Sequence, residues 1–326
     1  MTTEIPHSPP FPKGGDERLA KISLVGIGPG SLEHMTLAAR QAITEADTVI
    51  GYTTYIRLIQ SLLDGKEVIK QPMTEEIERA RLALERARAG RRVALVCSGD
   101  AGIYGMAGPT YEVLFEAGWT PDSNITVEVI PGPSAVNTCA SQVGAPLTHD
   151  FCTISLSDLL TPWPVIARRL EAAAVADFVV ILYNPKSGRR GEQIIHAQTI
   201  LLAHRDPRTP VAVVSSAYRP KQRVELATLA ELADCTIGMS STVLIGNSHT
   251  FIRDGLMVTP RGYAQKYDLL SGETRDGERR GRSLSSGLVG WRAALQESAE
   301  TPEALAKQFG LPVTYLHYVL AEAPSE

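Results

Sequence analysis

Three short apolar segments that each end in a glycine-rich loop constrain the fold of this chain more than any other feature of its sequence. The segments and the loops that follow them are Ile22–Val25 with Gly26–Gly30, Val93–Cys97 with Ser98–Gly102, and Ile125–Ile130 with Pro131–Ser134. Helical patterns, such as that of Met35–Ala46, lie between the segments. Strands that alternate with helices predict a largely parallel sheet. Because the carboxyl ends of parallel strands share one edge, we expect the three loops to form a ligand site there.

A similar pattern begins again beyond residue 145. Apolar runs at Phe151–Leu156, Phe178–Tyr183 and Val211–Ser215 alternate with helical stretches such as Gln193–His204. A chain of 326 residues has room for two domains of this kind. The predicted organisation is a disordered leader, an N-terminal α/β domain, a C-terminal α/β domain, a charged linker and a helical tail, at residues 1–20, 21–145, 146–270, 271–283 and 284–326.

The composition argues against several classes of protein. The net charge of −4 does not favour a nucleic-acid-binding protein, which is usually basic. No apolar run is long enough to cross a membrane, and the proline-rich leader lacks the apolar segment of a secretory signal. The four cysteines form no C-x-x-C pair, so we expect free thiols and no metal site. Together these features predict a cytoplasmic protein.

The first glycine loop is similar to a dinucleotide-binding loop but departs from it at two positions. Gly26 and Gly28 fit the G-x-G-x-x-G pattern, whereas Ser31 stands where the third glycine belongs. Pro29 removes one of the N–H donors that a pyrophosphate needs. No GKS or GKT sequence follows, so a Walker A loop is absent as well. We therefore expect a neutral or zwitterionic ligand rather than a phosphate.

Several motifs resemble those of the tetrapyrrole methylases. In chain order they are VGIGPG (25–30), SGDAGIYG (98–105), PGPSA (131–135) and PLTHD (146–150), and the resemblance covers about residues 21–269. The segments LYNPKSGRR (182–190) and SSTVLIGNS (240–248) resemble the precorrin-3B C(17)-methyltransferase branch. The resemblance implies two α/β domains of the tetrapyrrole methylase type, with the cofactor cleft between them, and a homodimer. It also implies a cobalamin-biosynthetic reaction: methyl transfer from S-adenosylmethionine to C17 of the tetrapyrrole precorrin-3B, with ring contraction to precorrin-4 and release of S-adenosylhomocysteine.

The resemblance also implies which residues contact the cofactor. Pro29 would line the cleft, and Gly99, Asp100 and Ile103 would hold the methionine and ribose portions. The other residues implied at the cofactor are Ser134, Ala135, Tyr183, Asn184 and, near the adenine, Ala217. Asn184 stands where many relatives have methionine, so Tyr183 is expected to share that contact.

Methyl transfer to a carbon atom needs little acid–base assistance, whereas ring contraction calls for a proton donor or acceptor. The sequence offers His149 and Tyr104 as candidates. The structural alternatives are a histidine at the domain junction and a tyrosine that packs at a helix start. A basic group formed by Lys186, Arg189 and Arg190 is the candidate site for the substrate's carboxylates, with a solvated loop as the alternative.

The helical tail allows more than one interpretation. The spacing of Leu305, Ala306, Gly310 and Leu316 is similar to that of a helix-turn-helix. Its second helix, PVTYLHYVL (312–320), contains no Lys or Arg, so an appendage for packing or dimer contact is favoured over a DNA reader. Two functional alternatives also stay open: a methyltransferase acting on another precorrin or a cobalt-precorrin, and a non-catalytic corrinoid-binding protein.

Overall fold

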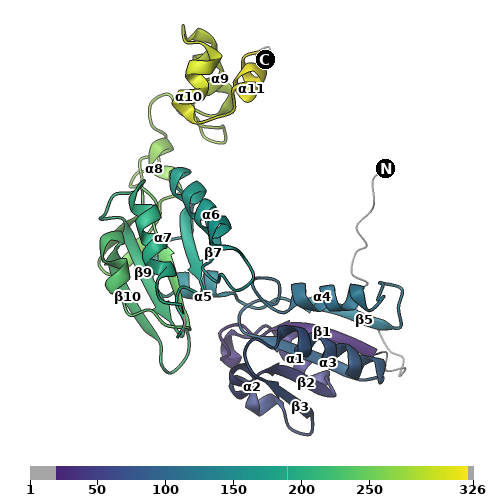
Figure 1. The fold of residues 1–326 in the computed structure, drawn as a ribbon. Helices are drawn as coiled ribbons and strands as arrows, with labels where there is room; N and C mark the ends of the chain where they lie inside the picture. The colour runs from purple at the N-terminus through teal and green to yellow at the C-terminus, as the bar shows by residue number, and fades with distance from the viewer. Residues whose placement is uncertain (1–19, 189, 322–326) are drawn as a thin grey trace. The chain divides into compact units, whose positions relative to one another are not determined.

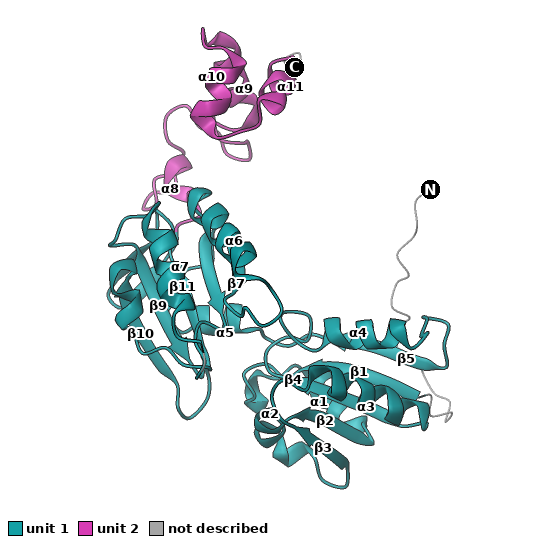
Figure 2. Cartoon of the chain, in the orientation of Figure 1, with its two compact units in different colours: residues 1–259 teal, residues 260–326 magenta. Residues whose placement is uncertain are grey.

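The computed structural model describes residues 20–188 and 190–321. It divides the chain into two compact units, residues 1–259 and 260–326 (Figure 2). The first unit contains two five-stranded sheets and a small three-stranded sheet, and the second is helical (Figure 1). This confirms an α/β fold with C-terminal helices. The predicted limits between the two α/β domains and at residue 270 stay a prediction, since both large sheets belong to one compact unit that ends at Thr259.

The first sheet is entirely parallel, with strand order β3-β2-β4-β1-β5. Its strands are β1 (Ala20–Gly26), β2 (Thr48–Tyr52), β3 (Glu67–Gln71), β4 (Arg92–Cys97) and β5 (Ile125–Ile130). Its helices are η1 (Leu32–His34), α1 (Leu37–Glu45), α2 (Thr53–Leu58), η2 (Gln60–Leu62), α3 (Glu76–Arg88) and α4 (Ala107–Glu116). Separate apolar clusters against α3–α4 and α1–α2 cover the sheet on both faces, which is why the central strand β4 is continuously apolar from Val93 to Cys97.

The second sheet is mixed rather than parallel, with strand order β10-β9-β11-β8-β7. Its strands are β7 (Phe151–Ser155), β8 (Val179–Tyr183), β9 (Pro210–Ser215), β10 (Arg223–Thr228) and β11 (Ser241–Ile245). Strands β7 and β8 pair in parallel, whereas β11 runs antiparallel to both β8 and β9. The accompanying helices are α5 (Ala135–Ala140), α6 (Trp163–Val175), α7 (Gln193–Leu202) and η3 (Leu229–Asp234).

A small third sheet lies at the end of the first unit. The hairpin β12 (Phe251–Arg253) and β13 (Leu256–Val258) pairs in parallel with β6 (Gly144–Ala145). A side chain at Gly144 would place its Cβ 2.7 Å from the carbonyl oxygen of Met257, so this position requires glycine. The segment that connects the two large sheets is thereby tied to the segment that follows the second sheet.

The second unit contains α8 (Tyr263–Lys266), α9 (Leu288–Glu297), α10 (Pro302–Phe309) and α11 (Val313–Ala321). The sequence Thr301-Pro302-Glu303 is typical of a helix start, and α10 begins there: the Thr301 hydroxyl accepts a hydrogen bond from the backbone N–H of Ala304. Gly310, with a φ of 64°, ends α10 and separates it from α11. Buried Leu305, Leu316 and Val319 belong to the apolar cluster that joins α9, α10 and α11.

Candidate functional site

The three glycine loops of the first sheet pack backbone against backbone. Gly28 and Gly99 exchange two hydrogen bonds, with N···O distances of 3.0 and 2.8 Å. A Cβ added at Gly132 would lie 2.3 Å from the carbonyl oxygen of Gly26 and 2.4 Å from that of Gly99. All three loops therefore meet at the carboxyl edge of the sheet, and glycine is required because no side chain fits between the backbones.

Asp100 fastens the second and third loops to each other. Its Oδ1 accepts a hydrogen bond from Gly102 N at 2.8 Å, and its Oδ2 accepts one from Gly132 N at 3.0 Å. Hydrogen bonds from N–H groups to an ionised carboxylate are among the stronger ones in proteins. The side chain that the sequence assigned to the cofactor thus also shapes the loops around it.

The second sheet contributes its own set of loops, and the antiparallel direction of β11 explains how. Ser241, the first residue of β11, pairs with Ser215, the last residue of β9. The start of β11 therefore lies at the same edge as the ends of β8 and β9. There, residues other than glycine adopt left-handed backbone conformations, among them Asn184 with a φ of 50° and Ser216 with a φ of 52°. The Asn184 amide donates to the Ser155 hydroxyl at 3.0 Å, and the Ser216 hydroxyl donates to that of Ser240 at 3.1 Å.

A cavity of about 370 Å³ is lined by loops from both sheets. This volume falls within the usual range for small-molecule sites. From the first sheet and the helix after it, the lining residues are Gly28, Pro29, Tyr52, Thr54, Tyr55, Met73, Ser98, Gly99, Asp100, Ile103, Tyr104, Pro133, Ser134, Ala135, Thr138 and Cys139. From the second sheet they are Tyr183, Asn184, Ser216, Ala217, Arg219, Met239, Ser240, Ser241 and Thr242.

Two side chains of the cavity wall reach from one sheet's loops to the other's. Tyr104 donates its hydroxyl to the carbonyl oxygen of Thr153 at 3.1 Å, and its ring lies 4.9 Å from that of Tyr183. Arg219 donates from Nε to the carbonyl oxygen of Pro29 at 2.6 Å and from Nη2 to the Ser98 hydroxyl at 2.8 Å. These contacts fix the cavity wall at two points.

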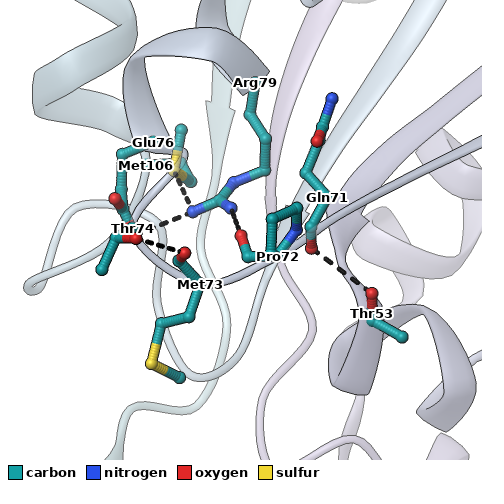
Figure 3. Close-up of polar contacts among 8 residues, drawn as sticks. All are labelled: Thr53, Gln71, Pro72, Met73, Thr74, Glu76, Arg79 and Met106. Atoms are coloured by element: carbon teal, nitrogen blue, oxygen red, sulfur yellow. Dashed lines mark hydrogen bonds and ion pairs between the residues drawn. The ribbon is translucent and has the colours of Figure 1, made fainter.

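A buried arginine holds the loop that brings Met73 to the cavity (Figure 3). Arg79 on α3 is only 4% exposed. Its Nη1 donates to the carbonyl oxygen of Pro72 at 2.7 Å, and its Nη2 pairs with Glu76 at 2.9 Å, so the buried charge has polar partners. Because Met73 follows Pro72 in the chain, this anchor holds Met73 at the cavity wall.

The structure brings most of the predicted site residues together. All of the predicted cofactor-binding residues line this same cavity, namely Pro29, Gly99, Asp100, Ile103, Ser134, Ala135, Tyr183, Asn184 and Ala217. Tyr104, a predicted catalytic residue, lines it too. The motifs led us to expect that these residues lie around one cavity, and the role of each residue in binding or catalysis stays a prediction.

The remaining predicted residues are not among those that line the cavity. His149 accepts a hydrogen bond at Nδ1 from the backbone N–H of Asp150, a contact typical of the structural alternative. Lys186 is exposed, and Arg190 donates to the carbonyl oxygen of Leu156 at 3.4 Å from a tight turn. Arg189 lies outside the described residues.

The sequence analysis did not single out several residues that line the cavity. Arg219 is the most polar of them, and the others include Tyr52, Tyr55, Met73, Thr138 and Met239. No short motif marks them, because they come from helices and loops whose position depends on packing. The only available signal for Arg219 was its place shortly after an apolar strand.

Burial sets the protonation of several groups in and near the cavity. Burial raises the pKa of Tyr183, whose hydroxyl accepts a hydrogen bond from Val136 N at 3.1 Å. Burial likewise raises the pKa of Cys97 to about 11 and raises that of Cys139. All four cysteines are free.

Within the described residues no group of three or more His, Cys, Asp or Glu side chains is arranged to hold a metal ion, and no helix could span a membrane.

The fold and the loop geometry define a methylase of the tetrapyrrole class. Residues 21–233 match the family described as Tetrapyrrole (Corrin/Porphyrin) Methylases, and the chain belongs to this family. It is a methyltransferase that uses S-adenosylmethionine, as its motifs predicted.

Two relatives sharpen this assignment. A cobalt-factor III methyltransferase of Priestia megaterium is 52% identical over 287 residues, which cover 87% of this chain. This chain spans about half of that protein's length, namely 53%. A probable cobalt-factor III C(17)-methyltransferase of Salmonella typhimurium is 48% identical over 242 residues, covering 74% of this chain and 99% of that protein.

Solved structures agree on the fold. The methyltransferase CobJ is 32% identical and matches 74% of this chain and 98% of its own, with a TM-score of 0.68. The uroporphyrin-III C-methyltransferase of Thermus thermophilus, solved with S-adenosylhomocysteine, is 27% identical and matches 69% of this chain and 97% of its own, with a TM-score of 0.56. The sequence motifs suggested the precorrin-3B branch of the family, whereas these two relatives are named for cobalt-factor III.

Proposed function

We propose that this chain transfers the methyl group of S-adenosylmethionine to C17 of cobalt-factor III, with contraction of the ring, in cobalamin biosynthesis. The observation that carries the proposal is the 48% identity to a probable cobalt-factor III C(17)-methyltransferase over nearly the whole of that protein. The sequence analysis put metal-free precorrin-3B first and kept the cobalt-containing analogue as its alternative. The names of the relatives favour the alternative.

The cavity residues suit the cofactor. S-adenosylmethionine carries no phosphate, and the first loop, with Pro29 in place of a donor, is poor at binding phosphate. Its methionine and ribose portions offer polar groups that backbone groups of the loops can bind. Gly28 and Gly99 line the cavity without a side chain, so a ligand can approach the backbone closely there, although their own N–H groups already bond to each other's carbonyl oxygens. We assign the cofactor to the residues that the motifs predicted: Pro29, Gly99, Asp100, Ile103, Ser134, Ala135, Tyr183, Asn184 and Ala217.

The chemistry asks the protein mainly to position two molecules. S-adenosylmethionine supplies an activated methyl group when bound, so no strong base is required for the transfer itself. The loops tied by Asp100 would hold the cofactor in one orientation, which lowers the entropic cost of the transfer. The apolar side chains of Met73, Ile103 and Met239 at the cavity wall would exclude water from the reacting atoms.

Tyr104 is our candidate for proton transfer during ring contraction. It lines the cavity, is 53% exposed, and has its hydroxyl within hydrogen-bond distance of only one described backbone carbonyl, that of Thr153. His149 stays a weaker proposal, because it is not among the cavity residues. For Lys186 and Arg190 the proposed role is electrostatic attraction of the substrate's carboxylates toward the cavity mouth.

The test is anaerobic incubation of the protein with methyl-labelled S-adenosylmethionine and either cobalt-factor III or precorrin-3B. We expect label on cobalt-factor III at C17, located by nuclear magnetic resonance of the product. Preferential labelling of precorrin-3B would reverse the choice of substrate. If S-adenosylhomocysteine binds but no macrocycle is labelled, the proposal is wrong, and tetrapyrrole binding without cofactor affinity would instead favour a carrier.

We also propose a homodimer, on the resemblance to the family alone. Sedimentation equilibrium of the full chain would measure the mass directly. A monomer at micromolar concentration would contradict this proposal without touching the proposed reaction.

A further inference from the structure

Arg219 is a positively charged residue of the cavity wall to which neither the motifs nor the names of the relatives assign a role. Arg219 follows β9 in a loop whose shape is fixed by its own hydrogen bonds. Arg219 N donates to the carbonyl oxygen of Ser216 at 3.0 Å, and Gln222 N donates to that of Arg219 at 2.9 Å. Ser216 and Tyr218 both hold left-handed backbone conformations, with φ values of 52° and 57°. Strain of this kind persists where the surrounding structure enforces it, which is common at functional sites.

One edge of the Arg219 guanidinium forms hydrogen bonds within the protein, and the other edge has donors without a partner among the described residues. Nε and Nη2 donate to the carbonyl oxygen of Pro29 and the hydroxyl of Ser98, which fixes the plane of the group. A guanidinium has five N–H donors, so both hydrogens of Nη1 and one of Nη2 remain. No bond from these hydrogens to another residue is found in the described part of the chain. The remaining edge has the geometry that binds a carboxylate through two parallel hydrogen bonds.

No acidic side chain of the described residues forms an ion pair with Arg219. Asp100 is the one acidic residue that lines the cavity within the described chain, and its two oxygens already accept bonds from Gly102 N and Gly132 N. Burial lowers the pKa of Arg219, since the charged form loses hydration. A partly buried arginine without a counter-ion is costly unless a ligand supplies the anion.

We propose that Arg219 binds a carboxylate of a molecule held in this cavity through its Nη1/Nη2 edge. Two sources have this chemistry: the amino-acid end of S-adenosylmethionine, and an acetate or propionate side chain of the macrocycle. The macrocycle source rests on the proposed function, whereas the cofactor source rests only on membership of the family. Lysine cannot replace arginine here, because its point charge cannot keep the contacts to Pro29 and Ser98 and also form a paired contact.

The first experiment uses calorimetry on the full chain, with S-adenosylhomocysteine and its decarboxylated analogue as probes. If the cofactor is the source, Arg219→Gln weakens binding of S-adenosylhomocysteine by about 10- to 100-fold and changes binding of the analogue by less than about 2-fold. Arg219→Lys recovers only part of the loss. Arg208→Gln, at an exposed arginine outside the cavity lining, is the matched control and leaves both affinities unchanged.

The second experiment measures binding of uroporphyrin III, a carboxylate-rich macrocycle, by fluorescence quenching, so that it needs no turnover. If the macrocycle is the source, Arg219→Gln weakens its binding by about 10-fold or more and leaves S-adenosylhomocysteine unaffected. The proposal is overturned if Arg219→Gln changes none of the three affinities. It is also overturned if all three affinities fall together by the same factor, because that pattern would mean that Arg219 acts only through its contacts to Pro29 and Ser98. Failure of methyl transfer by the wild type would affect the proposed function and neither binding result.

Discussion

The loops of the first sheet and those of the second form two walls of the cavity, and both contain residues in the left-handed backbone conformation. The residue types at these positions differ between the two walls. Loops after β1 and β4 turn at Gly28 and Gly99, which adopt left-handed conformations without strain. The loops after β8 and β9 turn at Asn184 and Ser216, where the left-handed conformation is strained and is held by side-chain hydrogen bonds. One wall is therefore built from backbone and the other from side chains.

The difference has a physical cause. In the first wall three loops touch one another directly, and a Cβ at Gly26 or Gly132 would overlap neighbouring backbone atoms. In the second wall, side-chain hydroxyl groups make the contacts between loops, as in the hydrogen bond of 3.1 Å from Ser216 to Ser240. Substitutions should accordingly be far less tolerated in the first wall.

The largest effect is expected for Gly132→Ala. Its Cβ would lie within 2.4 Å of two carbonyl oxygens of other loops, so the loops must separate. We expect a loss of about 3 kcal/mol or more in the free energy of unfolding, and loss of measurable S-adenosylhomocysteine binding. Urea unfolding and calorimetry measure the two quantities.

Gly108→Ala is the matched control for this substitution. Gly108 lies in α4 and a Cβ there would meet no atom within 4 Å, so alanine should stabilise the chain by up to about 1 kcal/mol. Equal effects at Gly108 and Gly132 would refute the backbone-packing account of the first wall.

Asp100→Asn should have the next largest effect. Asparagine keeps one acceptor and turns an NH2 group toward the N–H of Gly102 or Gly132. We expect unfolding to cost about 2 kcal/mol less and cofactor affinity to fall with it. Asp64→Asn, at an exposed position outside the cavity lining, serves as the control. A wild-type unfolding curve for Asp100→Asn would mean that the carboxylate does not fasten the loops.

The second wall is probed by a pair of substitutions at Asn184. Asn184→Ala loses the bond to Ser155 and keeps an unfavourable φ, which should cost about 1–2 kcal/mol. Asn184→Gly loses the same bond but relieves the strain, so its net effect should be under about 1 kcal/mol. Chemical denaturation of both variants gives the comparison. A larger cost for glycine than for alanine would show that the left-handed turn is not strained.

The smallest effects are expected at two helix caps, one in each compact unit. Thr36 caps α1 and also donates to the carbonyl oxygen of Pro131, whereas Thr301 caps α10. Each alanine substitution should cost about 1 kcal/mol of local stability, measured by amide hydrogen exchange. Only Thr36→Ala should weaken S-adenosylhomocysteine binding, by about 2- to 3-fold, because it touches the third glycine loop. A matching loss for Thr301→Ala would mean that the helical tail takes part in the site.

The parts of the site that the sequence predicted are those in which the backbone admits only glycine, so that the residue type itself marks the position. Gly28 and Gly99 are required by their left-handed conformations and Gly132 by the close approach of other backbone atoms, and each requirement leaves glycines in a short motif. Arg219 and Met73 carry no such signature, since each reaches the cavity through contacts with distant residues, Arg219 to Pro29 and Ser98, and Met73 through the anchor at Arg79.

The sequence by itself determined the apolar strands, the positions of the glycine loops at their ends and the cap at Thr301, because the residue types of a few consecutive positions reveal each of them. Only the tertiary structure decided the mixed direction of the second sheet. The antiparallel β11 brings Ser240 and Ser241 to the cavity, and a strand's apolar pattern is the same in either direction. Strand direction and the position of Arg219 depend on long-range pairing, which no local pattern encodes.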